Sequence, residues 1–328
     1  MSNSEFYPLC VRTSAKCEFS RAQLERRGLV AGISSKIMEH VEPDMESFRY
    51  SELLGRLEAF DAWLIRIGLT PKPNDRIHEA IKVLRKANAE SHRGQEAGIY
   101  TVIRPREWFP IIEALEAHDI LLAFEDDSSA AIAPSLKRAL SGPMHPSDET
   151  VKNRDGRNIW FELALAAEWR LRGASVSLGE PDLRLASNGV PFLIACKRPA
   201  IAESINGNLR DAIHQLQSNL DTSSPGTYGV AAISLSSVFN PGDKVFSGQM
   251  NGLRRLLDDE LDRQRPYLRS VTDGRISCVL FHAATPSVGE GVDLLRASYS
   301  VAQELHPSIG SKTFAEHGQA MRSNPKRR

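Results

Sequence analysis

An Asn188-Gly189 pair is the sequence feature that most constrains how this chain can fold. The pair separates two short, largely apolar runs, residues 182–187 and 190–197. Asparagine and glycine tolerate the positive φ angles of a type I′ turn, and the twist of that turn matches two antiparallel strands. The sequence therefore predicts a β-hairpin over residues 182–197.

Helical and strand-like patterns around this hairpin predict an α/β fold. A long helical pattern at 150–172 ends before Gly173, and a short strand pattern follows at 175–178. Beyond the hairpin the patterns alternate in the order helix 203–220, strand 228–236, helix 247–264, strand 276–283 and helix 290–304. Hairpin strands pair antiparallel, whereas strands joined through helices pair parallel. We therefore expect a mixed sheet flanked by helices.

The first 140 or so residues predict a mainly α-helical region. Apolar side chains recur every three or four positions, as in Leu53, Leu57 and Phe60, which places them on one helix face. The expected helices are 46–67, 74–90, 106–118 and 128–140.

A segment with two prolines and a glycine, residues 141–148, is the expected domain boundary. It predicts a helical domain over 1–145, an α/β domain over 146–305 and a basic tail over 306–328. The helical domain would serve substrate choice, oligomerisation or regulation.

Composition argues against several classes of protein. The chain has 41 Lys and Arg against 41 Asp and Glu, so its net charge of zero does not by itself point to a nucleic-acid or membrane partner. Any site for a polyanion has to be a local patch. The four cysteines lack CxxC spacing, which argues against structural zinc and a disulfide framework and favours the reducing cytoplasm. The N-terminus lacks a signal-peptide pattern, and no apolar run reaches the roughly 18 residues of a membrane span. We expect a cytoplasmic protein with no membrane partner.

A lysine and an aspartate stand at the same end of the predicted hairpin. Asp182 opens its first strand and Lys197 closes its second, so the turn brings a carboxylate beside an ammonium group. Glu162 stands in an otherwise apolar part of the preceding helix, from whose packed side it would point toward the sheet. Two carboxylates suit Mg²⁺, which keeps several waters and needs few protein ligands. A nearby lysine can orient the attacking water and stabilise phosphoryl-transfer charge.

This stretch resembles the PD-(D/E)xK phosphodiesterase superfamily, which has the restriction-endonuclease-like fold. Pro181-Asp182 matches the PD element, and Lys197 follows fifteen positions after the aspartate. Glu162 matches the glutamate that many members contribute from the helix before the hairpin. The resemblance covers about residues 150–285, and it implies nothing for the helical region.

The resemblance implies a metal-dependent deoxyribonuclease that uses Mg²⁺ or Mn²⁺. Glu162, Asp182 and the backbone carbonyl of Cys196 would bind the metal, and Lys197 would position the attacking water. The Cys196 thiol would point away, into the core. DNA is the expected partner, with RNA as an alternative, and we expect a homo-oligomer with a role in prokaryotic defence or restriction.

Ala195 departs from the family pattern, because it stands where members carry an acid and alanine cannot bind a metal. Three explanations stay open. Alanine is an inactivating substitution for a natural acid, or the acid has moved, or the site is degenerate and only binds nucleic acid. The candidates for a moved acid are Glu162, Glu180, Glu203 and Asp211.

Arginines near the site are candidates for phosphate contacts, because a guanidinium group binds phosphate through two parallel hydrogen bonds. The three candidates are Arg157, Arg198 and Arg210. The alternative for each is ordinary surface charge. Gln215 resembles a glutamine that some family members have near the site.

Two other functions stay open beside the nuclease. One is a catalytically degenerate nucleic-acid-binding module, and the other is a protein-interaction scaffold, which the neutral net charge favours. The chain lacks GxGxxG, GxxxxGK[ST] and GxSxG, which argues against a dinucleotide dehydrogenase, a P-loop NTPase and an α/β-hydrolase. Its histidines lack the spacing of a zinc hydrolase.

Overall fold

The computed structural model describes most of the chain from residue 49 onward. The described residues are 49–97, 109–126, 129–150, 152–242, 246–247, 251–288, 294–306, 310 and 312–313. All of them lie in one compact unit. The expectations for residues 1–48, and for most of the basic tail, lie outside the described residues.

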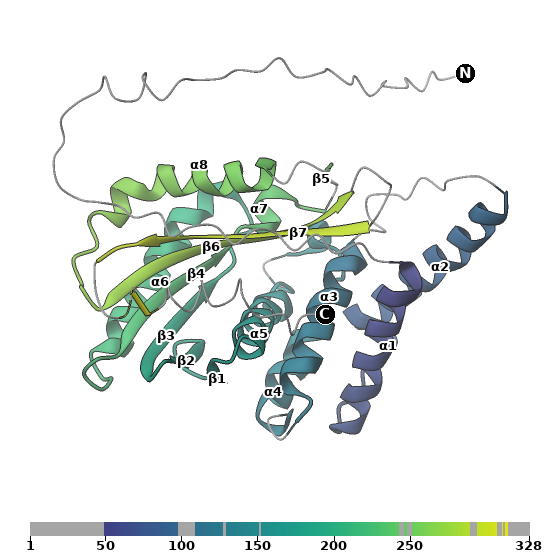
Figure 1. Cartoon of the computed structure of the whole chain (residues 1–328), viewed down its shortest axis with the longest axis horizontal. Helices are drawn as coiled ribbons and strands as arrows, with labels where there is room; N and C mark the ends of the chain where they lie inside the picture. Colours follow the sequence, from purple (N-terminus) through teal and green to yellow (C-terminus); the bar gives the residue numbers. More distant parts are fainter. Residues whose placement is uncertain are drawn as a thin grey trace, which may run out of the picture. The chain divides into compact units, whose positions relative to one another are not determined.

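A mixed sheet of seven strands is the scaffold of the fold (Figure 1). The strands lie in the order β1-β2-β3-β4-β6-β5, and β7 pairs with β6. Their bounds are β1 Ser175–Leu178, β2 Leu183–Ser187, β3 Val190–Lys197, β4 Tyr228–Ser234, β5 Phe246–Ser247, β6 Ile276–Val288 and β7 Leu294–Glu304. The first three strands pair antiparallel, and β3, β4 and β6 pair parallel. The predicted α/β domain with a mixed sheet is confirmed.

The β2–β3 hairpin has the turn that the sequence predicts. Ser187 pairs with Val190, so the connection is a two-residue turn. Asn188 has a φ angle of 50° and Gly189 one of 77°, which are the positive values that a type I′ turn requires. This turn fixes the register of both strands and therefore decides which residues meet at their far end.

Helices cover both faces of the sheet (Figure 1). One face is covered by α6 (Ile205–Leu220) and α8 (Asn251–Leu268). The other face is covered by α3 (Phe109–Phe124) and α5 (Asp155–Leu171), against which pack α1 (Tyr50–Arg66), α2 (Arg76–Ala97) and α4 (Ser129–Ala139).

Strand β3 supplies side chains to both layers, because successive residues of a strand point to opposite faces. Leu193 and Ala195 pack in the cluster under α6 and α8. Ile194 and Cys196 pack in the cluster under α3 and α5. A strand buried on both faces reads as a continuous apolar run, which is the pattern of residues 190–197.

The core on the α3 and α5 face is continuous from the N-terminal helices to the sheet. Leu53, Leu57 and Phe60 of α1 are fully buried, as their spacing predicts, and they belong to the same cluster as Ile194 of β3. The segment 141–148, where we expected a domain boundary, therefore does not separate two hydrophobic cores. The helical region is packed onto the site-bearing sheet.

The helix expected at 290–304 is wrong, because Leu294–Glu304 forms strand β7, antiparallel to β6. Its described side chains follow a period of two: Val301 and Gln303 are buried, whereas Ser300 and Ala302 are partly exposed. Pairing with the long β6 satisfies the backbone groups at that edge, and such tertiary pairing outweighs a weak local pattern.

Candidate functional site

Asp182 lies directly before β2, at the end of the hairpin opposite the turn. Because Leu183 pairs with Ile194, the register brings Asp182 beside the last residues of β3. The backbone N–H of Cys196 donates a hydrogen bond to Oδ2 of Asp182 at 2.7 Å. The hairpin therefore holds this carboxylate at the carboxyl end of β3, as the sequence predicts.

Lys197 is the last residue of β3, and its ammonium group faces Asp182. Its Nζ lies 3.7 Å from Oδ2 of Asp182, and it donates a hydrogen bond to Oε1 of Gln215 at 2.6 Å. Gln215, on α6, in turn donates from Nε2 to the carbonyl of Pro181 at 2.8 Å. The glutamine thus connects the lysine to the chain just before the aspartate.

Glu162 approaches the same place from α5. The pKa of its carboxyl is raised from 4.5 to about 7. Burial is the largest cause and the negative charge of Asp182 adds to it, whereas the positive charge of Lys197 opposes the rise. Burial also raises the pKa of Asp182. The hydrogen bond from the Cys196 N–H and the positive charge of Lys197 lower this pKa and so oppose the rise. The charges of Asp182 and Lys197 both act on the Glu162 carboxyl, which places the three side chains expected at the site in one electrostatic neighbourhood.

Two partly buried carboxylates beside one ammonium group suit a hard divalent cation. Each carboxyl is held in surroundings that disfavour its negative charge, and a cation between Glu162 and Asp182 would relieve that cost. Within the part of the chain that the structure describes, no three His, Cys, Asp or Glu side chains are grouped to hold a metal. Two carboxylates fit Mg²⁺ or Mn²⁺ with bound water better than zinc.

Position 195 carries no acid and is fully buried. Ala195 packs with Leu209 and Ala212 of α6 in the apolar cluster on that face. Of the acids considered as replacements, Glu180 is exposed and its charge raises the pKa of Asp182, so it lies near the site. Glu203 and Asp211 are also exposed, Asp211 one turn before Gln215 on α6. The small side chain of alanine fits this apolar cluster between β3 and α6.

Cys196 is buried, and its thiol belongs to the core on the α5 face. Burial, together with the negative charges of Asp182 and Glu162, raises the pKa of the thiol well above its usual value. A thiol that stays protonated is a poor nucleophile. Its backbone N–H, rather than its sulfur, takes part in the site.

The candidate arginines fall into two groups. Arg157 and Arg198 are largely buried and form ion pairs with Glu149 at 2.7 Å and 2.6 Å. Arg210 is exposed on α6, where it donates to Asn206 and lies over the ring of Tyr267. The structure therefore places only Arg210 on the surface, and Arg157 and Arg198 serve an internal network.

The carboxylates of that network were missed at the sequence level. Glu113 lies within an apolar stretch of α3, and its partner Arg157 is 44 positions away. Glu149 follows the Pro-rich segment among polar residues, and its partner Arg198 is 49 positions away. For Glu113 the available signal was a charged residue in a run of buried apolar residues, the same signal that singled out Glu162, whereas the surroundings of Glu149 in sequence gave no such signal.

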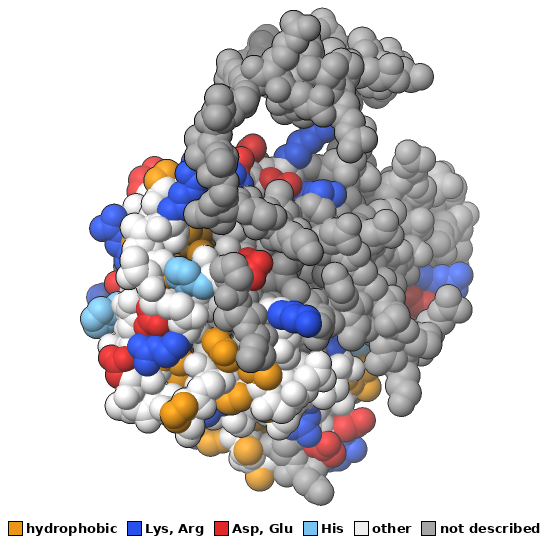
Figure 2. All heavy atoms as spheres, turned by 60° about the vertical axis from the view of Figure 1, so that its left-hand side comes forward, with side chains coloured by type: hydrophobic (Ala, Val, Ile, Leu, Met, Phe, Trp, Pro, Cys, Tyr) orange, Lys and Arg blue, Asp and Glu red, His pale blue; other side chains and the backbone are white. Residues whose placement is uncertain are grey.

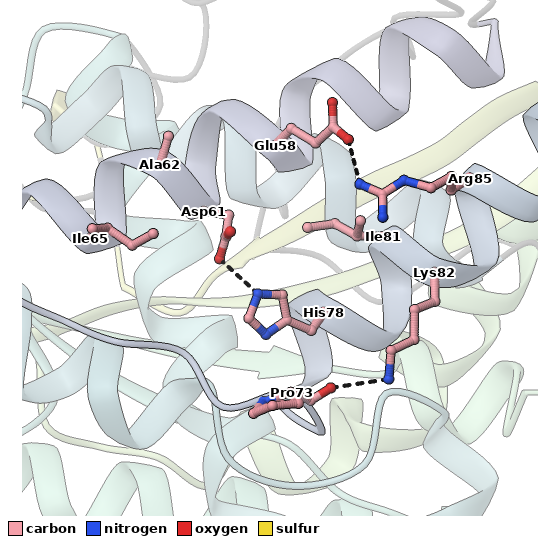
Figure 3. Close-up of a pocket in the computed structure, with 9 residues that line it drawn as sticks. All are labelled: Glu58, Asp61, Ala62, Ile65, Pro73, His78, Ile81, Lys82 and Arg85. Carbon is pink, nitrogen blue, oxygen red and sulfur yellow. Dashed lines mark hydrogen bonds and ion pairs between the residues drawn. The ribbon is translucent and has the colours of Figure 1, made fainter.

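A shallow pocket of about 490 Å³ lies between α1 and α2 and contains none of the candidate site residues (Figure 3). Its charged groups face one another: Glu58 pairs with Arg85, Asp61 with His78, and Lys82 donates to the carbonyl of Pro73. These are ordinary salt bridges and hydrogen bonds between two surface helices. The larger pocket is therefore separate from the candidate site residues.

The described surface shows interspersed charges. Figure 2 shows Lys and Arg side chains mixed with Asp and Glu side chains on the described part of one face, with hydrophobic side chains between them. The pattern agrees with a net charge of zero. Among the helices that the structure describes, none is both long and apolar enough to cross a membrane.

Comparison of the chain with family models, curated proteins and solved structures finds no match.

Proposed function

We propose that this protein is a metal-dependent phosphodiesterase that cleaves nucleic acid, with DNA as the substrate, on a restriction-endonuclease-like α/β fold. The observation that carries the proposal is the approach of Lys197 to Asp182 at the carboxyl end of β3, with Glu162 near enough for both charges to act on its carboxyl. They come from a helix, a strand entrance and a strand end, and such a convergence of charged groups in partly buried surroundings is typical of functional sites.

The roles follow from the chemistry of each group. Glu162, Asp182 and the Cys196 carbonyl would hold Mg²⁺ or Mn²⁺. The metal would supply charge neutralisation of the phosphate and a lowered pKa for a bound water. The amino group of Lys197 lies 3.7 Å from Oδ2 of Asp182 and can donate a hydrogen bond to the attacking water or to a phosphate oxygen. Gln215 holds the lysine in place.

The absence of an acid at position 195 does not remove the carboxylate pair. Magnesium is commonly held by one or two carboxylates with waters and substrate phosphate completing its shell. Glu180 is the relocated acid that the electrostatics favour, since its charge acts on Asp182. We therefore propose an active site with Glu162 and Asp182 as its essential acids and Glu180 in support.

A plasmid-nicking assay with Mn²⁺ tests the proposal. The chain should convert supercoiled DNA to the open circle, EDTA should stop it, and Asp182→Asn should reduce the rate by at least a hundredfold. Asp259→Asn is the matched control, because Asp259 is an exposed acid on α8 that is not among the candidate acids. No nicking by the chain, with none gained by Ala195→Glu, would contradict the nuclease assignment.

A second candidate function is a nucleic-acid-binding module without catalysis. The fully buried Ala195 favours it, because no metal ligand stands at the family's second acidic position. A gel-shift titration separates this candidate from a protein-interaction scaffold. Binding that weakens steeply with salt indicates phosphate contacts. DNA binding without cleavage would support the module, and nicking by Ala195→Glu alone would indicate a lost acid.

A further inference from the structure

A second pocket lies at the same edge of the sheet as the candidate site. Its lining includes Arg198, which directly follows β3, Ser234, which ends β4, and Ser236 and Ser237 of the short helix α7 (Ser236–Phe239). Strands β3 and β4 are parallel, and ligands of open α/β sheets commonly bind beyond the carboxyl ends of parallel strands. Its position is therefore one where a ligand is expected.

Two arginines that line the pocket, Arg157 and Arg198, belong to a buried chain of five charges. Arg76 pairs with Glu113, Glu113 with Arg157, Arg157 with Glu149, and Glu149 with Arg198. Three arginines alternate with two glutamates, and the carboxylate of Glu116, which also lines the pocket, balances the remaining positive charge. None of the five side chains is more than 11% exposed.

One of the lining arginines has a hydrogen-bond donor without an acceptor. The Nη2 atom of Arg157 is buried without a hydrogen-bond partner among the described residues. Glu116, which is partly exposed at the pocket, accepts a hydrogen bond from Trp160 at 2.6 Å and provides a negative charge near Arg76. A buried guanidinium donor that lacks a partner attracts an anion.

The serine hydroxyls also offer donors to the pocket. Ser237 accepts a hydrogen bond from Nη2 of Arg198, and Ser236 accepts one from the backbone N–H of Ala284 at 2.9 Å. Ser234 and Ser236 share one further hydrogen bond. A hydroxyl has a single proton, so this cluster of three hydroxyls uses one proton internally and keeps two to donate. The wall therefore has donors to offer a ligand that accepts hydrogen bonds.

The size of the pocket limits the ligand. Its volume is about 50 Å³, which is room for a few water molecules, since one needs about 10–15 Å³, or for one tetrahedral oxyanion. A nucleobase would not fit.

We propose that this pocket binds one phosphate group. Arg198, Ser236 and Ser237 would donate to its oxygens, and His282, on β6 beside Ser234, also lines the pocket. Lys197 and Arg198 are consecutive but serve different groups, Lys197 facing Asp182 and Arg198 facing Glu149. The phosphate would be one beside the scissile phosphate on the same nucleic-acid strand. This last assignment rests on the proposed function; the pocket itself does not.

Calorimetric titration of the full chain with inorganic phosphate, at ionic strength held constant with chloride, tests the pocket. Ser236→Asp places a negative charge in the pocket, and its carboxylate can still accept the Ala284 N–H. It should weaken phosphate binding at least tenfold, and Ser237→Ala should weaken it several-fold. Ser218→Asp is the matched control, because Ser218 is exposed on α6 and does not line the pocket. No saturable phosphate binding, or equal binding by Ser236→Asp, would overturn the proposal.

A second titration identifies the source of the phosphate. A fluorescent DNA duplex, added without divalent metal, should bind Ser236→Asp at least fivefold more weakly than the Ser218→Asp control. Loss of inorganic phosphate binding with unchanged DNA affinity would mean that the pocket takes a free phosphate, and would overturn the strand assignment. Phosphate binding in a chain that never nicks DNA would leave the pocket standing and refute the nuclease.

Discussion

Nζ of Lys197 lies 2.6 Å from Oε1 of Gln215 but 3.7 Å from Oδ2 of Asp182. The lysine therefore makes a hydrogen bond to a neutral amide on α6, whereas the carboxylate lies beyond hydrogen-bond distance. This arrangement orients the lysine toward the site and leaves the negative charge of Asp182 available to a cation.

Removal of this amide is expected to slow cleavage. Gln215→Ala releases Lys197 and leaves the Pro181 carbonyl without its donor, so we expect the cleavage rate at saturating DNA to fall about tenfold, in line with the loss of one positioning hydrogen bond. Gln217→Ala, two positions along α6, is the control. Affinity for DNA should change little, and a fall in affinity with an unchanged rate would show that Gln215 serves binding instead.

The raised pKa of Glu162 makes stability depend on pH in a defined direction. Its pKa is about 7 in the folded protein against an ordinary 4.5, so the folded state binds the proton more tightly and the penalty of the charged form appears as pH rises from 4.5 to 7. Glu162→Gln removes the penalty. Without metal, the variant should match the wild type near pH 4.5 and exceed it by about 2 kcal/mol above pH 7, after allowance for partial exposure.

Urea unfolding at a series of pH values measures this difference. Glu203→Gln, at an exposed acid, is the control for the loss of one carboxyl group. Mg²⁺ should stabilise the wild type and not Glu162→Gln, because the cation favours the charged carboxylate. A pH-independent difference for Glu162→Gln would show that Glu162 titrates as an ordinary surface acid.

Glu149 is expected to matter for stability rather than for cleavage. It joins Arg157 and Arg198, all largely buried, and removal of one partner leaves a buried charge without compensation. Glu149→Gln should lower the free energy of unfolding by about 3 kcal/mol. Asp155→Asn breaks the exposed pair with Arg138 and should cost less than about 1 kcal/mol. Equal effects in chemical denaturation would contradict a buried network.

Two glycine substitutions should change stability in opposite directions. Gly189 has a positive φ angle in the hairpin turn, and an added Cβ meets no atom within 4 Å. Gly189→Ala should therefore lower the free energy of unfolding by about 1 kcal/mol, from the backbone strain alone. Gly207 lies in α6 with similar open space and no positive φ, so Gly207→Ala should stabilise by up to about 1 kcal/mol. Stabilisation by Gly189→Ala would exclude the turn described.

The hairpin and its charged end could be predicted because local rules decide them. Asn188-Gly189 selects one turn, the turn selects the register, and the register brings Asp182 to the end of β3. Glu162 could be predicted from an acid in an apolar helical run. These steps need only nearby sequence.

Features that depend on distant partners could not be predicted. Glu149 and Glu113 take arginines far along the chain, and β7 forms because β6 offers it an edge. The continuous core across 141–148 is a further case, since a Pro-rich segment in sequence carries no information on whether the surfaces it joins are packed together.

Manganese binding to the full chain tests the central claim most directly. Anomalous scattering from crystals soaked in Mn²⁺ should give one peak between the carboxylates of Glu162 and Asp182, and the peak should be lost in Asp182→Asn crystals soaked in the same way. Mn²⁺ bound elsewhere, or a peak that persists in Asp182→Asn, would contradict a shared metal site at the end of β3.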